Sequence, residues 1–410
     1  MRGVKIASVV EHAVLHIAAE SLSRLACDVL EDNRLASYTE KSSRYQVLDR
    51  GSYHVPVEVQ GQPIERVYRE TCDALFDAYH SLIERCTEYL KSTTPREEGE
   101  KDGAYNLRIR RVVTDHCRFV LPTATLTNVG VTMNARALEH AITKLLSHEL
   151  AECRELGKRL KEQGQAVAPT LVKYANRSEY LAWTRQTLRP ARPVRGEPVE
   201  PRTGTSVRSR LVDYDRDAED RLVTALLYRV LDQPYEVVRA SVAQLSKREK
   251  DAIVDTALKK LGPFDSPVRE AEMVAYTFEL EMDYGAYREY RRHRMQTFIP
   301  QALTVGYGYV VPPLIEEAGC GAAFGEAMAR SAAAYHAVAK DSPLVAEYLV
   351  THAHIVRLAA RLNLRECYHL LKLRSASQAH FTIQVVAKQM LQQIRDVHPL
   401  LVEHIRLRDA

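Results

Sequence analysis

The chain of 410 residues is 46% hydrophobic and 27% charged, the composition of an ordinary globular protein with room for two hydrophobic cores. Its net charge of +4 permits an anionic ligand but does not favour nucleic-acid binding. Seven cysteines without paired spacing argue against a disulfide framework or a zinc site and favour the reducing cytoplasm. Glu11 and His12 interrupt the most apolar N-terminal stretch and no run reaches membrane-spanning length, so neither a signal peptide nor a membrane span is predicted.

In the first half of the chain, hydrophobic periodicity predicts one strand and three helices. A loosely alternating pattern at residues 4–19 predicts a strand, and a helix is expected at 20–31. Residues 32–45 are polar and are expected to be irregular. Apolar residues three and four positions apart predict long helices at 63–90 and 134–163.

The second half follows a change of composition near residue 187. Residues 185–212 are rich in Pro, Gly and Arg, which predicts a disordered linker between domains at 1–184 and 213–410. Hydrophobic spacing then predicts a strand and three further helices, the strand at 276–280 and the helices at 217–261, 322–340 and 363–397. The chain is therefore predicted to be an α+β protein dominated by helices.

Landmarks of the first half recur in the second half in the same order. The segments Tyr53-His-Val-Pro56 and Ala78-Tyr-His80 return as Tyr309-Val-Val-Pro312 and Ala334-Tyr-His336. The pattern Asn134-Ala-Arg136 with His140 returns as Asn363-Leu-Arg365 with His369, and each Asn is expected to open a long helix. Ordered recurrence of several landmarks is hard to obtain by chance, so the sequence predicts a duplicated domain of about 180 residues.

The segment Arg292-His293-Arg294 is the strongest candidate site in the second repeat. It combines guanidinium donors with a titratable ring, a set that suits a phosphate and a polar heterocycle better than a protein core. On its own a basic triplet is usually solvated surface. The triplet indicates a site because an altered copy of its surroundings recurs in the first repeat.

Together these landmarks resemble the flavin-dependent thymidylate synthase family. The family signature is Arg-His-Arg, seven residues, then Ser continued by x-Arg-Tyr, followed later by Arg-x-x-Leu-Pro, Asn-x-Arg, His and Leu-x-Leu-Arg. The resemblance covers nearly the whole chain twice, apart from the linker. It implies two repeats of the family fold, each a small sheet packed with long helices, that together form a pseudo-dimer.

The two repeats depart from the signature in complementary places. The first repeat keeps Ser42, Arg44 and the Arg118-x-x-Leu-Pro stretch, but it has Asp32 and Lys144 near the positions of the first signature Arg and the Leu-x-Leu-Arg guanidinium. The second repeat keeps Arg-His-Arg and Arg374. The positions that would carry the other ligands hold Ala302, Thr304 and Glu347, and Glu289 replaces the usual Gln.

The resemblance implies one complete nucleotide site per repeat pair, because the family shares each site between two subunits. The substrate ligands would be Arg292 and Arg374 from the second repeat with Glu40, Ser42, Arg44 and Arg118 from the first. Arg374 and Ser42 would act on the reacting ring, Arg374 by stabilising negative charge and Ser42 by orienting the substrate. The flavin would meet a larger set of residues, namely His293, Arg294, Asn363, Arg365, His369, Asn134, Arg136 and His140.

The implied reaction is reductive methylation of dUMP to dTMP, with FAD as cofactor and methylenetetrahydrofolate and NADPH as co-substrates. A homodimer of this chain would stand for the family's tetramer. The classical Cys-dependent synthase would require a Cys directly after a Pro, and no Cys of this chain follows a Pro. No metal is expected, since the His352/His354 pair has no third ligand at useful spacing.

Two alternatives stay open at the level of sequence. A catalytically lapsed homologue could bind flavin or nucleotide, or act as a scaffold, without turnover. A basic helical protein could bind nucleic acid through the arginine-rich linker, although the modest net charge disfavours that function.

Overall fold

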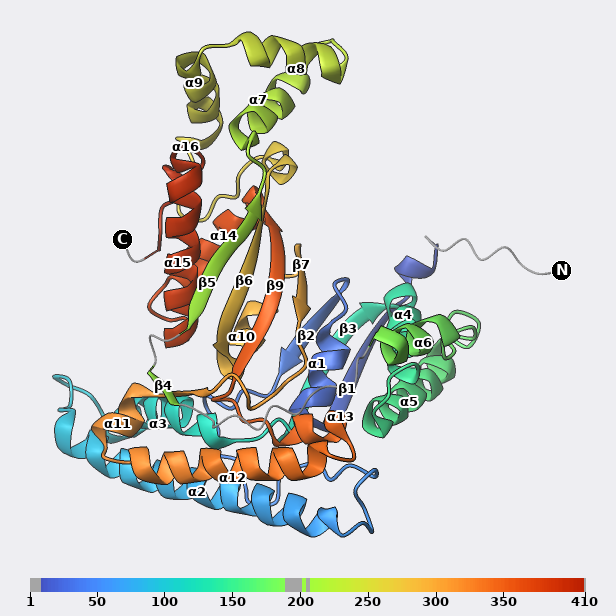
Figure 1. The fold of residues 1–410 in the computed structure, drawn as a ribbon, viewed down its shortest axis with the longest axis vertical. Coiled ribbons are helices and arrows are strands. Elements are labelled where there is room, and N and C mark those ends of the chain that lie inside the picture. Colours follow the sequence, from blue (N-terminus) through green and yellow to red (C-terminus); the bar gives the residue numbers. More distant parts are fainter. Residues whose placement is uncertain (1–8, 189–200, 204–206, 409–410) are drawn as a thin grey trace. The chain divides into compact units, whose positions relative to one another are not determined.

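The computed structural model describes residues 9–188, 201–203 and 207–408, and the chain forms two compact units. The first unit comprises residues 1–201 and 303–354, and the second comprises 202–302 and 355–410. Figure 1 shows the fold, and each unit is described by itself below. Because the chain leaves and re-enters each unit, the compact units differ from the sequence repeats.

The first unit contains a three-stranded antiparallel sheet in the order β1-β3-β2. The strands are β1 (Val14–Ser23), β2 (Ala36–Glu40) and β3 (Leu126–Asn134). Alternate residues of β3 are buried, as expected for a strand with one face on the core. A short 3-10 turn, η1 (Val9–His12), precedes the sheet, and four helices accompany it: α1 (Arg24–Glu31), α4 (Ala135–Leu146), α5 (Ala151–Val167) and α6 (Glu179–Leu188).

A helical layer completes the first unit and draws on both repeats. The first repeat supplies α2 (Ile64–Thr93), α3 (Asp102–Cys117) and η2 (Arg118–Val120). The second supplies β8 (Tyr309–Val311), α11 (Pro313–Glu317), α12 (Gly321–Ala339), α13 (Pro343–Ala346) and η4 (Glu347–Leu349). The helices α2 and α12 pack side by side (Figure 1), which buries the apolar stripe of each against the other repeat.

The segments that begin within η2 and η4 pair with each other around a pseudo-twofold axis inside the first unit. Equivalent residues of the two repeats exchange equivalent backbone hydrogen bonds: Thr123 N to Val350 O at 2.8 Å and His352 N to Leu121 O at 3.0 Å, then Ala124 N to Tyr348 O at 2.9 Å and Ala353 N to Phe119 O at 3.0 Å. Each of these four backbone bonds therefore has its counterpart from the other repeat. This reciprocity is the pattern of an isologous dimer interface, here within one chain.

The second unit contains a four-stranded antiparallel sheet in the order β5-β6-β9-β7. Its strands are β5 (Arg208–Tyr214), β6 (Ala275–Asp283), β7 (Gln296–Pro300) and β9 (Ile355–Asn363). The helix α15 (Phe381–Val397) packs against β5 and β6. The remaining elements are α7 (Ala218–Tyr228), α8 (Tyr235–Gln244), α9 (Lys247–Leu258), η3 (Arg269–Met273), α10 (Tyr284–Tyr290), α14 (Leu364–Arg374) and α16 (Pro399–Val402), and the short strand β4 (Pro201–Thr203) precedes β5.

The α+β class and the two repeats are confirmed. The order β1-α1-β2, α2, β3-α4-α5 in the first repeat matches β6-α10-β7, α12, β9-α14-α15 in the second. Each repeat thus has a small sheet and long helices, and the reciprocal backbone bonds make the chain a pseudo-dimer. Within the described residues, no helix combines the length and the apolar character needed to cross a membrane.

Several boundaries predicted from periodicity were wrong. The helix expected at 134–163 is interrupted between α4 and α5, where the Ser147 hydroxyl bonds back to the Thr143 carbonyl at 2.6 Å. The helix expected at 363–397 breaks after Arg374, where the Ser375 hydroxyl donates a hydrogen bond to the Leu371 carbonyl at 2.6 Å. Side-chain bonds of this kind compete with the helix, and they leave no trace in the apolar spacing.

Four other segments also differ from the expectation. The helical region at 217–261 is three helices, and the segment at 32–45 contains β2. The helix α3 was not predicted. Of the expected linker at 185–212, helix α6 runs to Leu188 and β5 begins at Arg208, while 189–200 and 204–206 lie outside the described residues.

Candidate functional site

The buried imidazole of His293 lies at the centre of the candidate site in the second unit. Its side chain is 3% exposed, and both ring nitrogens are engaged. Nδ1 lies 2.9 Å from Oε1 of Glu366, and Nε2 accepts a hydrogen bond from Nε of Arg374 at 2.8 Å. Because Nε2 must accept, the proton is on Nδ1, which donates to the carboxylate.

The protonation state of this pair follows from its burial. Burial lowers the pKa of His293 well below its ordinary value, and the positive charge of Arg374 lowers it further. Burial also raises the pKa of Glu366. The ring is therefore neutral at physiological pH and acts as a fixed acceptor that orients the guanidinium.

A carboxylate holds the other side of the Arg374 guanidinium. Nη1 of Arg374 donates to Oε1 of Glu289 at 2.6 Å, and Oε2 of Glu289 accepts from the backbone N–H of His380 at 3.1 Å. Burial lowers the pKa of Arg374, while the Glu289 charge opposes that effect. The position where the family has Gln thus carries a full negative charge against the guanidinium.

The remaining predicted residues of the second unit surround this centre. Arg292 is exposed and makes no hydrogen bond or ion pair with another residue that the structure describes, and Arg294 is exposed as well. Asn363 caps α14 by accepting from the Glu366 N–H at 2.8 Å. Nη1 of Arg365 pairs with Glu272 at 2.8 Å, and the His369 ring lies 5.3 Å from the His293 ring.

In the first unit, three of the predicted substrate ligands lie together. Nη2 of Arg44 and Nη2 of Arg118 bind the two oxygens of Asp115, at 2.7 and 2.8 Å. The Ser42 hydroxyl accepts from the Arg44 N–H at 3.2 Å, and Nη1 of Arg118 donates to the Ser43 hydroxyl at 3.4 Å. Two guanidiniums beside a hydroxyl form a donor set that suits a phosphate.

Glu40, the fourth predicted ligand of this half, is a buried structural anchor. Its carboxylate pairs with the buried Arg24 and accepts from the Thr127 hydroxyl at 3.0 Å. Glu40 also belongs, with Cys27 and Glu31, to a group of possible metal ligands. The Arg24 pairing already compensates its charge, which makes a cation there electrostatically costly.

The three predicted flavin residues of the first repeat line one cavity of about 550 Å³. Asn134 caps α4 by accepting from the Ala137 N–H at 2.9 Å, and Arg136 pairs with Glu11 at 2.5 Å. The cavity wall comprises Glu11, Asp32, Asn33, Arg34, Leu35, Asn134, Arg136, Ala137 and His140. Its volume is that of a small-molecule site.

The first repeat replaces the His293–Arg374 core with a simpler contact. Asn33 takes the place of His293, and its amide donates to the Leu30 carbonyl at 2.7 Å. Nζ of Lys144 binds the Asp32 carboxylate at 2.8 Å and the Asp32 carbonyl at 3.0 Å. Lys144, hydrogen-bonded to Asp32 of the same repeat, thus lies near the position of the missing guanidinium.

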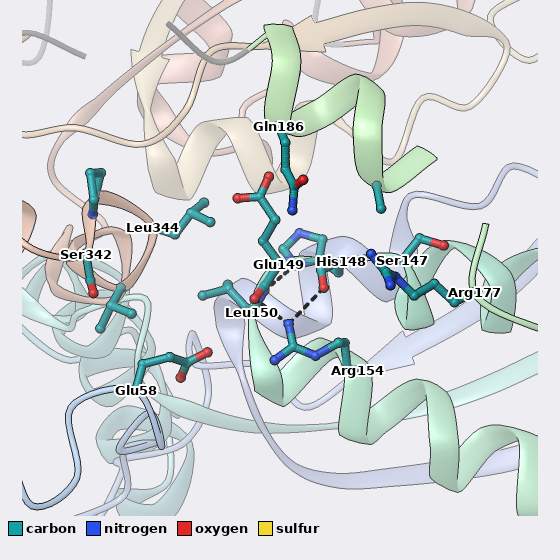
Figure 2. Close-up of a pocket in the computed structure, with 13 residues that line it drawn as sticks. Glu58, Ser147, His148, Glu149, Leu150, Arg154, Arg177, Gln186, Ser342 and Leu344 are labelled. Carbon is teal, nitrogen blue, oxygen red and sulfur yellow. Dashed lines mark hydrogen bonds between the residues drawn. The ribbon is translucent and has the colours of Figure 1, made fainter. Parts of the chain in front are cut away.

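A second cavity, of about 630 Å³, lies at the start of α5 in the first unit. Figure 2 shows Nη1 of Arg154 bound to the backbone carbonyls of His148 and Glu149, with the former bond 3.0 Å long. Glu58 also lines this cavity and accepts from the Ala151 N–H at 2.8 Å. None of the predicted nucleotide or flavin ligands is part of its wall.

Comparison with known proteins decides the family. The model of the thymidylate synthase complementing protein family, Thy1, matches residues 1–170 and 210–400. The chain belongs to this family. Its two matched segments are a tandem duplication of the flavin-dependent thymidylate synthase fold.

Individual relatives fall into two groups. A UPF0159 protein of Chlamydia muridarum is 29% identical over 98% of this chain and 78% of its own length. The flavin-dependent thymidylate synthase of Clostridium tetani is 30% identical over 42% of this chain and 66% of its own length, the share expected for one repeat. The solved flavin-dependent thymidylate synthase of Helicobacter pylori, complexed with FAD and dUMP, is 18% identical, with a TM-score of 0.36 over 49% of this chain and 99% of that one.

Sequence reasoning missed the carboxylates that pair with the predicted cations. Asp115 could have been found from its position three residues before Arg118, which faces it across one helical turn. Glu366 and Glu272 give no comparable signal, because they reach His293 and Arg365 from distant parts of the chain.

Proposed function

We propose that the chain is a flavin-dependent thymidylate synthase that methylates dUMP with methylenetetrahydrofolate and NADPH, at one nucleotide site per chain. Membership of the family over both repeats supports the reaction class. The observation that carries the single site is the complementary survival of ligands, since Ser42, Arg44 and Arg118 persist in one repeat and Arg374 in the other.

The proposed roles follow from the donors that each side chain offers. Arg44 and Arg118, with Ser42 two residues before Arg44, would bind the phosphate, and the exposed Arg292 would add a further guanidinium. Arg374, oriented by the neutral His293, would stabilise negative charge on the uracil ring and make its C5 more nucleophilic. Glu40, the last residue of β2, would hold the end of the strand from which the loop with Ser42 continues.

The chemistry of the cavity in the first repeat fits a flavin. Arg136, His140 and Asn134 would hold part of FAD there, and His293, Arg294, Asn363, Arg365 and His369 would serve in the second repeat. Both nitrogens of His293 are engaged, so that ring would meet the cofactor through its face or edge. Bound flavin would supply the redox chemistry, and the chain would supply binding and orientation.

The alternative is a homologue that binds nucleotide or flavin without turnover. The carboxylates of Glu289 beside Arg374 and Glu347 at the position equivalent to Arg118 favour it, because each places negative charge where the family has a neutral or cationic group. We further propose a homodimer of the chain, which light scattering would measure.

Tritium release from dUMP labelled at C5 tests the proposal, with flavin absorbance of the purified protein as a first check. Active protein releases tritium only when folate and NADPH are present, whereas a lapsed homologue binds dUMP and releases none.

Single substitutions test the assignment of ligands to both repeats. Arg118→Gln and Arg374→Gln should each weaken dUMP binding or turnover by at least about tenfold. Arg108→Gln is a matched control on α3. Nη2 of Arg108 lies 2.7 Å from the Glu100 carboxylate, and Arg108 is not one of the predicted ligands. If nucleotide binding survives both single changes, the shared site is wrong.

A further inference from the structure

The contact between Glu289 and Arg374 has a consequence for the reactivity of the proposed site. Glu289 lies on α10 and reaches α14, and its side chain is 17% exposed against 14% for Arg374. The pair is therefore largely shielded from water, and its charges interact more strongly than a surface ion pair would.

The donors of Arg374 show which part of the guanidinium remains available. Nε is used by His293 at 2.8 Å and Nη1 by Glu289 at 2.6 Å. Nη2 makes no hydrogen bond to any residue within the described part of the chain. The free edge can donate to a ligand, but the charge behind it is already balanced by Glu289.

We propose that Glu289 is a built-in counter-ion that limits how strongly Arg374 stabilises negative charge on a bound ring. The inference rests on the proposed function. It makes Glu289 a specificity-determining residue, because the site favours a neutral uracil ring and resists a ring that carries negative charge. Removal of the Glu289 charge makes Arg374 a stronger electrostatic catalyst.

The charged groups around the pair do not supply the same compensation. Glu366 faces His293 rather than the guanidinium, and Arg292 adds positive charge near Arg374. His380 meets Glu289 through its backbone N–H. Glu289 is thus the carboxylate hydrogen-bonded to this guanidinium.

The first repeat shows a related pairing at the corresponding helix. Lys144 on α4 binds Asp32 at 2.8 Å, so each repeat places a carboxylate on the cation of this helix. The acids come from different positions, Asp32 from the signature loop and Glu289 from the preceding helix. Charge compensation at this point has therefore been reached by two separate contacts.

Glu289→Gln separates the charge from the position of the side chain. Its amide oxygen can still accept from the His380 N–H or from Arg374, while the negative charge is lost. We expect about tenfold faster tritium release from dUMP, because one unit charge a few ångströms away is removed in a partly screened site. The ring N3–H of bound dUMP, followed by ultraviolet titration, should be about tenfold more ionised at a given pH.

Two controls isolate the effect. Glu281→Gln removes a similarly buried carboxylate in the same unit, whose Arg357 partner lies 2.6 Å away, and should change neither readout. In an Arg374→Gln background, Glu289→Gln should give no gain, because the guanidinium that it releases is absent. Should Glu289→Gln fail to fold, Glu289→Ser gives the same comparison with water beside Arg374.

The outcomes separate the two hypotheses. Folded Glu289→Gln protein that binds dUMP with unchanged ring ionisation and unchanged release overturns the counter-ion role. Failure of both the wild-type protein and Glu289→Gln to bind dUMP overturns the proposed function itself. A gain in both readouts that needs Arg374 supports the inference, since damage to the fold would not produce it.

Discussion

The two repeats share their backbone bonds and differ in the side chains that could do chemistry. Asn134 and Asn363 cap equivalent helices with equivalent bonds, at 2.9 and 2.8 Å. Yet the helices that they open carry Lys144 closed on Asp32 in one repeat and Arg374 held by His293 in the other. Duplication thus preserved the scaffold of both halves, while the side chains at the predicted ligand positions differ between them.

The pseudo-twofold axis shows the same divergence inside the core. The reciprocal backbone bonds join segments in which Thr123 and Thr125 of the first repeat occupy the positions equivalent to His352 and His354 of the second. His354 is completely buried, and its Nδ1 lies 3.0 Å from the Thr351 N–H. One repeat therefore carries a titratable ring where the other has a hydroxyl.

The largest expected difference between the repeats is in turnover. Arg374→Gln should lower tritium release by about 10²- to 10³-fold, the usual loss when a charge-stabilising donor is removed. Lys144→Gln should change it by less than about threefold, because Lys144 is closed onto Asp32. Equal losses in the two variants would mean that both repeats contribute alike.

The next largest effect is a dependence of stability on pH. It should come from His354 of the second repeat, which lies beside the pseudo-twofold axis. Burial lowers the pKa of His354 to about 3, against about 6.5 in an unfolded chain. Between these values the unfolded chain binds a proton that the folded chain does not. The free energy of unfolding should therefore fall as pH decreases below about 6.5, by on the order of 1 kcal/mol per pH unit.

Urea unfolding between pH 7 and pH 5 measures this slope. His354→Gln should make the slope shallower, with the remainder due to the buried His293, whose pKa is lowered as well. His12→Gln should leave the slope as in the wild-type protein, because His12 is exposed. A slope that is the same in all three proteins would show that His354 is not the group responsible.

The smallest expected effect is a symmetrical one. Asn134→Ala and Asn363→Ala each remove a helix cap, and each should lower the free energy of unfolding by about 1 kcal/mol. Asn106→Ala, at an exposed position within α3, is the control and should not destabilise. Thermal unfolding of the three variants checks this, and strongly unequal losses at the two caps would break the structural equivalence of the repeats.

The sequence predicted those features that depend on local order. The Asn-x-Arg motifs located both caps, and the spacing of landmarks located the duplication. Breaks in the long helices could not be predicted, because apolar periodicity continues across the turns around Ser147 and Ser375. The ion pairs could not be predicted either, since Arg44 and Asp115 are 71 residues apart and meet only in the folded chain.

The stoichiometry of dUMP binding tests the central claim most directly. Calorimetric titration of the purified chain, with its flavin content measured in parallel, should give one nucleotide site per chain, because the proposed ligands of the two repeats add up to one complete set of donors. Two equal sites per chain would contradict the account, and so would a single site that persists unchanged in both Arg118→Gln and Arg374→Gln.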